Sequence, residues 1–297
     1  MQFRPLSATP ALRRLQFGHF SESDQVNSAL RKKILSRDNN TCVDCKLKLP
    51  RHMEVRHLDD NHDNGAEENL ACVCPFCHCR DHLHTTGFAR AGLLIGSTAQ
   101  NQAVINSISL ACWYILDRIP DDTDIRVIPS AEADEMKALR QVAELINLDF
   151  HTKSLRWGDA FGKLVTEPDA FAEALSDLSV QQPEAYAARS GTTKHLHVLP
   201  LKSAFHAQCT DWFLHFDKVR PISSWIKGLD SWLGHLGMTR EELAESSKSI
   251  TRRASRTEPP KDLGRPIGKP SPPSAGNLVD PFDSLGTSGN AAGSRYD

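Results

Sequence analysis

The stretch from Thr41 to His84 reads TCVDCKLKLPRHMEVRHLDDNHDNGAEENLACVCPFCHCRDHLH and holds six of the eight cysteines of the chain. Cys42 and Cys45 form one C-x2-C pair, and Cys74 and Cys77 form a second. This spacing lets two thiolates bind one tetrahedral ion from a tight turn, and a shell of four thiolates leaves no position open for water. The stretch therefore predicts a structural zinc ion bound by these four cysteines.

The other four cysteines are predicted to be packing residues. Cys72 and Cys79 lie beside the predicted ligands, and either could replace a neighbour in the zinc shell. Cys112 and Cys209 fall in apolar helical surroundings. Clustered cysteines in a chain whose first residues lack an apolar run of signal-peptide length indicate a reducing compartment and a metal site, rather than disulfides.

Composition narrows the function classes. The 297 residues include 35 basic and 37 acidic side chains, so nothing in the net charge of -2 attracts nucleic acid to the protein as a whole. The longest apolar region, around 105–119, is interrupted by polar residues, so we expect no membrane insertion. A chain of this length buries roughly three quarters of its unfolded surface. We therefore expect a cytoplasmic protein with one substantial core.

The pattern around the cysteines predicts a helix, a strand, a polar turn and a second metal pair. Val26, Leu30 and Ile34 recur at helical spacing after Ser21, and the run at 53–60 alternates like a short strand. A strand, a turn and a helix around one ion outline a treble-clef or ββα-metal unit. Such a short unit needs the ion because it cannot bury a core alone.

The rest of the chain is predicted to be mainly helical. Predicted strands span 92–96, 125–128 and 196–199, and predicted helices span 100–119, 131–148, 168–178, 203–219 and 223–236. The sequence thus predicts an α+β fold: a lead at 1–20 without assigned structure, then one zinc-containing domain at 21–245 whose metal core lies at 41–84. The Pro/Ser/Gly-rich tail at 246–297 is predicted to be disordered.

The same stretch resembles the HNH (His-Asn-His) endonuclease unit. The resemblance rests on His57, Asn69 and the run C-x2-C-H-x3-H that contains His78 and His82. It implies His57 as general base, Asn69 as the residue that orients it, and His82, or else His78, as ligand of a catalytic Mg²⁺ or Mn²⁺. Phosphodiester hydrolysis in DNA needs such a base and such a cation.

One position departs from the nuclease pattern. The residue before the base in these nucleases is a second metal ligand, His, Asp or Glu, and here it is Arg56. A guanidinium stays protonated and cannot ligate a cation. Asp59, Asp60 or His62 could substitute, but their spacing does not require it. The alternative interpretation is a zinc-stabilised unit whose extra histidines are surface residues.

A longer resemblance is to the DotN (IcmJ) family of the Dot/Icm type IVB secretion system. It covers residues 25 to 218 and is carried by RKKILSRDNNTCVDC, EVRHLDDNHDNGAEENLACVCPFC, GLLIGSTAQNQAVINSISLACWYIL, KSLRWGDAFGKLVTEPDAFAEAL and LPLKSAFHAQCTDWF. That family is a zinc module with an HNH-like core, and its zinc ligands correspond to Cys42, Cys45, Cys74 and Cys77. This chain keeps three histidines of the nuclease set that other members do not share in full.

The resemblance implies an adaptor rather than an enzyme. Members associate with the coupling ATPase DotL and with other subunits of the complex that recruits secretion substrates. We therefore expect a cytoplasmic adaptor, peripheral to the inner membrane, that binds a DotL-like coupling ATPase. The competing expectation is a metal-dependent HNH endonuclease that acts on DNA, and a third is a DNA-binding zinc module without catalysis.

Overall fold

The computed structural model describes Leu6 and residues 28–59, 63–98, 100–120, 130–162, 166–228, 230, 233–234, 237–243 and 245. The predicted lead apart from Leu6, the strand predicted at 125–128 and the tail predicted at 246–297 lie outside the described residues. Within them the protein is rich in helix, with two small two-stranded sheets, as the predicted α+β class requires.

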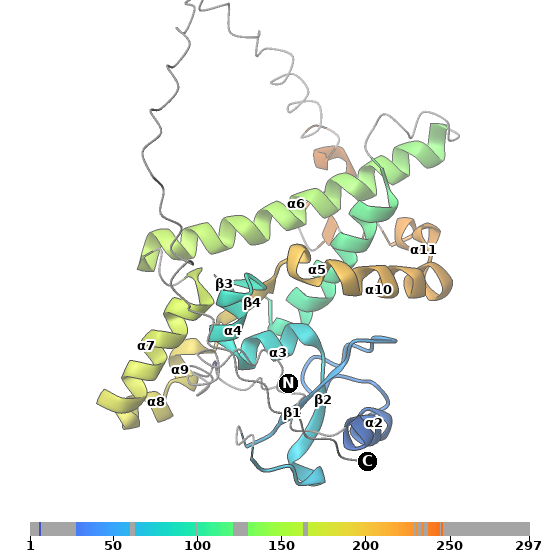
Figure 1. Cartoon of the computed structure of the whole chain (residues 1–297). Coiled ribbons are helices and arrows are strands. Elements are labelled where there is room, and N and C mark those ends of the chain that lie inside the picture. The colour runs from blue at the N-terminus through green and yellow to red at the C-terminus, as the bar shows by residue number, and fades with distance from the viewer. Residues whose placement is uncertain are drawn as a thin grey trace, which may run out of the picture. The chain divides into compact units, whose positions relative to one another are not determined.

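The first half of the chain, coloured blue to green in Figure 1, contains the two cysteine pairs. In chain order its elements are α2 (Ser28–Arg37), β1 (Glu54–His57), the 3-10 turn η2 (Glu67–Asn69), β2 (Leu70–Val73), α3 (Pro75–Asp81), α4 (Leu83–Phe88), β3 (Gly92–Gly96) and α5 (Gln102–Arg118). The second half comprises α6 (Ser130–Phe161), α7 (Pro168–Gln181), α8 (Pro183–Ala187), α9 (Ser190–Thr193), β4 (Leu196–Pro200), η5 (Lys202–Phe205), α10 (His206–Val219) and α11 (Ile222–Ile226).

Both sheets are antiparallel pairs. In the first, β1 pairs with β2 so that Glu54 lies opposite Val73 and His57 opposite Leu70. The hairpin leads directly into α3, so the predicted strand, turn and helix follow one another with a second strand, β2, between the turn and the helix. In the second sheet β3 pairs with β4, which follows about a hundred residues later, and Gly92 lies opposite Pro200. The second sheet therefore ties the metal-binding half of the chain to the C-terminal half.

The β3–β4 sheet separates two buried hydrophobic clusters because side chains alternate along each strand. Ile95 and Leu199 face the larger cluster, which also contains the four paired cysteines, while Leu94 and Val198 face the smaller one. Aromatic rings fill the larger cluster: the Phe76 ring lies edge-on to three others, Trp113, Phe205 and Trp212, with centroids 5.0 to 5.6 Å away. Edge-to-face pairs at these distances are favourable.

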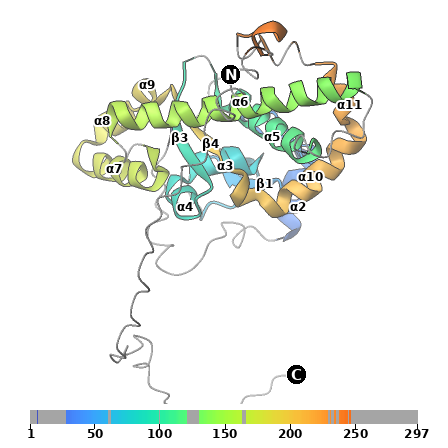
Figure 2. The same cartoon turned by 90° about the horizontal axis from the view of Figure 1, so that it is seen from above.

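Helix α6 extends well beyond the predicted end at residue 148. Ser154 donates a hydrogen bond to the Leu94 carbonyl (3.0 Å), and Trp157 lies so close to Gly96 that a Cβ there would fall 2.4 Å from the ring. Figure 2 shows α6 running across β3 and β4. Packing against the second sheet stabilises these last helical turns, and the periodicity of the segment alone did not reveal it.

Helix α11 is shorter than predicted. The sequence predicted a helix over 223–236; α11 ends at Ile226, where the Gly228 N–H bonds the Trp225 carbonyl in a turn, and the described residues 230, 233 and 234 are again helical. The segment predicted as a helix over 203–219 begins with the tighter turn η5 before α10. No helix among the described residues is both long and apolar enough to cross a membrane.

His197 makes stability sensitive to mild acid. It is 4% exposed in β4, and burial, together with the nearby Arg80 charge, lowers its pKa to about 4. Unfolded His197 binds a proton below its ordinary pKa, whereas the folded form stays neutral until about pH 4. Stability is therefore expected to fall as the pH drops from 6.5 to 4, by up to about 3 kcal/mol.

The variant His197→Gln tests this expectation. The free energy of unfolding from urea titrations should depend less steeply on pH between 4 and 6.5 than in the wild type. Some dependence should persist, because burial also lowers the pKa of His84. Equal slopes for the two proteins would show that His197 is not the group responsible.

Candidate metal centre

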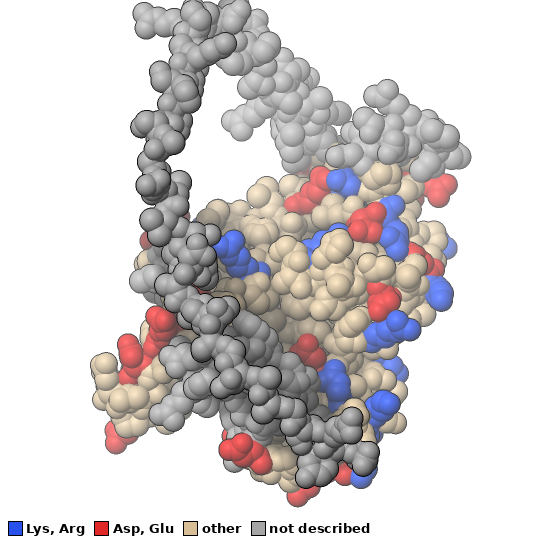
Figure 3. All heavy atoms as spheres, in the orientation of Figure 1, with Lys and Arg blue, Asp and Glu red and all other residues tan. Residues whose placement is uncertain are grey.

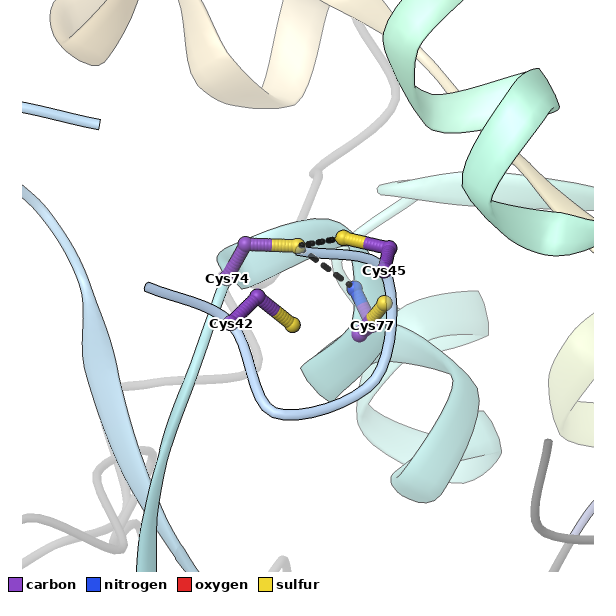
Figure 4. Close-up of side chains that lie close together, drawn as sticks. All are labelled: Cys42, Cys45, Cys74 and Cys77. Atoms are coloured by element: carbon purple, nitrogen blue, oxygen red, sulfur yellow. Dashed lines mark hydrogen bonds between the residues drawn. The ribbon is translucent and has the colours of Figure 1, made fainter. Parts of the chain in front are cut away.

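The first cysteine pair sits in a tight turn between α2 and β1. Thr41 and Lys48 form an isolated antiparallel bridge, and within it the Cys42 N–H donates to the Leu47 carbonyl (2.9 Å). Lys46 closes the turn with a φ of 62°, in the left-handed region that residues other than glycine seldom adopt. This closure folds the chain back so that Cys42 and Cys45 present their sulfurs from the same turn (Figure 4).

The second pair is presented by the start of α3. Cys74 is the N-cap residue, Pro75 occupies the first turn, and the Cys77 N–H points at the Cys74 sulfur at 3.4 Å. Proline suits this position because its missing N–H has no helical partner there. Helical geometry then brings the residue three positions later back beside the cap, so the spacing itself determines that the two sulfurs converge.

The four sulfurs gather into one buried cluster. All Sγ atoms of Cys42, Cys45, Cys74 and Cys77 lie within 4.8 Å of one another, and Cys45 and Cys74 are 3.5 Å apart. Figure 4 shows the side chains converging from the turn and from the strand-to-helix junction. A tetrahedral zinc with Zn–S bonds near 2.3 Å requires sulfurs about 3.8 Å apart. The residues could therefore hold a metal ion such as zinc.

The electrostatics of the cluster also favour a cation. Burial raises the pKa of the Cys74 thiol well above its ordinary value, and hydrogen bonds from the three other cysteines raise that of Cys77, whereas hydrogen bonds from its three neighbours lower the pKa of Cys42. Four buried sulfurs cannot all be ionised next to one another without a compensating charge. A bound divalent cation would stabilise the thiolates, so metal binding and thiol deprotonation would occur together.

Two buried polar residues support the cluster from α5. Asn106 donates from Nδ2 to the Cys77 sulfur at 3.2 Å, and its Oδ1 accepts from Gln102 Nε2 at 2.8 Å. Gln102 in turn bonds both the N–H and the carbonyl of Val198 on β4. The sequence prediction missed both residues. Their signal was a pair of amides four positions apart on a helix otherwise rich in apolar side chains.

Asn106→Leu is expected to weaken metal binding while leaving the fold intact. The substitution removes the hydrogen bond to Cys77 Sγ but keeps the branched shape of the side chain, and loss of such supporting contacts costs about 10- to 100-fold in affinity. Competition with a chromogenic chelator measures the change. Asn147→Leu, in a partly buried position of α6, is the matched control. Equal affinities for the two variants would contradict this role.

Arg56 lies inside the protein, bound to two carboxylates. Its guanidinium is 4% exposed and contacts Asp44 through both terminal nitrogens (2.6 and 2.9 Å) and Asp81 at 2.7 Å. Burial by itself would lower the pKa of Arg56. The charges and hydrogen bonds of Asp81 and Asp44 have the larger effect and raise this pKa above its ordinary value. The ion pairs join β1 to the cysteine turn and to the end of α3. Arg56 therefore has a structural role.

His57 lies on the other side of the hairpin from α3. Glu54 pairs with His78 and Arg56 with Asp81, so these two β1 residues face α3. Val55 instead packs on Ile34 of α2. Because side chains alternate along a strand, His57 shares the face of Val55. It is 3% exposed, so the residue expected as a general base is buried.

Asn69 organises the loop between β1 and β2. Its Nδ2 donates to the Asp59 carboxylate and to the Asn64 carbonyl, both at 2.8 Å, and its Oδ1 accepts the Asp59 N–H at 3.1 Å. The amide thus closes this loop on itself. The nuclease resemblance implies that Asn69 orients His57. None of these three hydrogen bonds involves His57.

His78 and His82 lie next to each other at the end of α3. Their ring centroids are 4.6 Å apart in an edge-on arrangement, and His78 Nδ1 pairs with Glu54. Within the described part of the chain, the four cysteines are the only group of three or more Cys, His, Asp or Glu side chains close enough to hold a metal ion. No such group among the described residues contains His57, His82 or Asp59; Asp60 and His62 lie outside the described residues.

The remaining cysteines pack as predicted. Cys72, Cys112 and Cys209 are buried and Cys79 is partly buried, and none belongs to the metal cluster. Burial raises the pKa of Cys72, Cys79 and Cys112 to about 12, as expected for unreactive thiols.

No protein-family model and no curated protein matches the chain.

Proposed function

We propose that the chain is a zinc-stabilised adaptor subunit of a type IVB secretion or related conjugative coupling complex, and that it binds the coupling ATPase. In this proposal the β1–β2 hairpin and α3 form an HNH-like unit that serves as a scaffold. The metal is zinc, because four thiolates in a tetrahedral cluster are its preferred structural site. The protein would be cytoplasmic and held at the inner membrane through the complex.

The observation that carries the proposal is the closed ligand set of the metal cluster. Four cysteines, each less than a tenth exposed, bring their sulfurs within 4.8 Å of one another inside the core. A catalytic site keeps one coordination position open for water or substrate, and a shell of four thiolates does not. A metal bound here would support folding and not catalysis. In the proposal, the function is therefore carried out by residues on the protein surface.

The surroundings of Arg56 also favour a scaffold. This position would supply a cation ligand in a nuclease, but here it carries a positive charge that Asp44 and Asp81 hold in place. His57, the next residue, is buried on the face of the hairpin that packs against α2. Among the described residues visible in Figure 3, acidic side chains lie next to basic ones.

Helix α6 supplies an apolar surface suited to a protein partner. Leu148 and Leu155 are 62% and 69% exposed and lie seven residues, or two turns, apart on the same side of the helix. In the proposal, the partner contacts this side of α6. The long resemblance to the secretion-system family points to the class of partner.

Co-purification tests the proposal. The full chain is co-expressed with the tagged coupling ATPase encoded in the same genome, and the complex is isolated on the tag. We expect the wild type to be retained and the double variant Leu148→Glu/Leu155→Glu to be released, while the exposed control Val180→Glu on α7 is retained. Failure of the wild type to bind any coupling ATPase from its own genome would refute the adaptor role.

The second candidate function is a metal-dependent HNH endonuclease. The observation in its favour is the order of elements, with His57 ending β1, Asn69 preceding β2 and His82 ending α3. It predicts cleavage of plasmid DNA with Mg²⁺ or Mn²⁺ that disappears in His57→Ala while zinc content and melting temperature persist. Intact plasmid across divalent metals would exclude it. Salt-sensitive retention of duplex DNA without cleavage would instead favour a DNA-binding zinc module.

A further inference from the structure

Two buried amides on α5 lie between the metal centre and the second sheet. Gln102 and Asn106 are four positions apart, about one helical turn, and both residues are 0% exposed. A side-chain amide carries an oxygen that only accepts hydrogen bonds and a nitrogen that only donates them. Because leaving either atom unpaired inside a protein costs free energy, the neighbours of a buried amide decide which way round it lies.

The backbone of β4 fixes the orientation of Gln102. The Val198 N–H donates to Gln102 Oε1 at 2.9 Å, and Gln102 Nε2 donates to the Val198 carbonyl at 2.7 Å. The backbone groups cannot exchange roles, so a reversed Gln102 amide would set donor against donor and acceptor against acceptor. Val198 therefore permits one orientation, in which the second hydrogen of Gln102 Nε2 is directed to another acceptor.

Asn106 takes its orientation from Gln102. Its Oδ1 accepts from Gln102 Nε2 at 2.8 Å, and its Nδ2 then lies 3.2 Å from Cys77 Sγ. If the Asn106 amide were reversed, its nitrogen would face the donor of Gln102 and its oxygen would face the sulfur. A metal-bound thiolate has no hydrogen to donate to that oxygen, so two acceptors would meet. The backbone of β4 thus decides that a hydrogen-bond donor faces Cys77.

We propose that Gln102 is a positioning residue of the metal centre, acting through Asn106 to keep a hydrogen-bond donor on Cys77 Sγ. An N–H directed at a thiolate stabilises the negative charge on the sulfur, and contacts of this kind orient the ligand and tune the metal. The hydrogen bonds of Gln102 reach Asn106 and Val198, so its effect on the metal depends on Asn106. The proposal requires a metal at the four cysteines but not the adaptor role.

Zinc affinities of four full-length proteins test this dependence: the wild type, Gln102→Met, Asn106→Leu and the double variant. Methionine keeps the length of the Gln102 side chain but removes its amide. By chelator competition, we expect Gln102→Met to bind zinc about 10- to 100-fold more weakly than the wild type. The double variant should bind about as tightly as Asn106→Leu alone, because Gln102 acts through Asn106. Losses that multiply in the double variant, or wild-type affinity in Gln102→Met, would overturn the proposal.

Spectra of the cobalt-loaded proteins separate positioning from a general effect on stability. Co²⁺ bound by thiolates has a sulfur-to-metal charge-transfer band, and the energy of this band falls when a sulfur loses a hydrogen-bond donor. We expect the band to move to longer wavelength by similar amounts in Gln102→Met and Asn106→Leu. The control Gln208→Met, at a partly buried glutamine of α10, should leave the band in place. An unchanged band in Gln102→Met would refute the positioning role.

If Gln102→Met does not fold, NMR of the cadmium-loaded wild type provides the second measurement. Scalar coupling between cadmium and the Nδ2 hydrogens of Asn106 should report the hydrogen bond to the Cys77 sulfur, and the Nε2 hydrogens of Gln102 should exchange slowly with water. Absence of the coupling, or fast exchange of the Gln102 hydrogens, would contradict the proposal. A wild type that binds neither zinc nor cadmium would refute the metal centre as well.

Discussion

Cys77→Ser is expected to abolish metal binding and to unfold at least the segment from Thr41 to His84. Cys77 supplies one of four buried sulfurs, and a hydroxyl is a poor replacement for a thiolate ligand of zinc. Structural zinc binding is worth roughly 10–16 kcal/mol in small zinc modules. Because whole domains are stable by only about 5–15 kcal/mol, the loss should exceed what the segment can withstand.

Metal content by mass spectrometry and thermal melting followed by circular dichroism measure this effect. The wild type should contain one equivalent of zinc, and Cys77→Ser should contain none and melt at a much lower temperature. Cys42→Ser should behave in the same way. Cys209→Ala, which alters a buried cysteine outside the cluster, should keep its metal. Wild-type melting and zinc content in Cys77→Ser would show that the ligand set is wrong.

Arg56→Met is expected to destabilise the fold by about 3–5 kcal/mol. The methionine keeps much of the side-chain volume but leaves Asp44 and Asp81 inside the protein without the cation that balances them. Burial already raises the pKa of Asp44, so its charged form tolerates the loss of Arg56 poorly. The midpoint of urea unfolding at constant zinc concentration reports the change in the free energy of unfolding.

Two further variants separate the loss of charge balance from a general effect of replacing arginine. Arg118→Met breaks the more exposed ion pair with Asp217 and should cost no more than about 1 kcal/mol. Arg56→Met combined with Asp44→Asn and Asp81→Asn removes all three charges and should recover much of the lost stability. If Arg56→Met lies within 1 kcal/mol of the wild type, the buried ion pairs are not what holds β1, the cysteine turn and α3 together.

The position of Arg56 changes how the nuclease resemblance is interpreted. The sequence alone showed that a positively charged arginine occupies the position of a metal ligand. It left open whether neighbouring residues could supply that ligand instead. In the folded protein its charge is balanced by residues 12 and 25 positions away. Strand alternation also puts His57 on the face opposite α3. Neither fact follows from motif spacing, because each depends on which elements pack on which side of the hairpin.

The sequence alone correctly predicted that Cys42, Cys45, Cys74 and Cys77 come together, and it predicted the strand at Gly92–Gly96 and the position of α5. C-x2-C spacing makes two sulfurs converge within one turn, so local geometry is sufficient. Only the tertiary structure decided that Asn106 supports Cys77, that α6 continues to Phe161, and that Leu6 is buried in the smaller cluster with its carbonyl bound by Arg189. These contacts join residues that are distant along the chain, and their free energy appears only when the elements that carry them pack together.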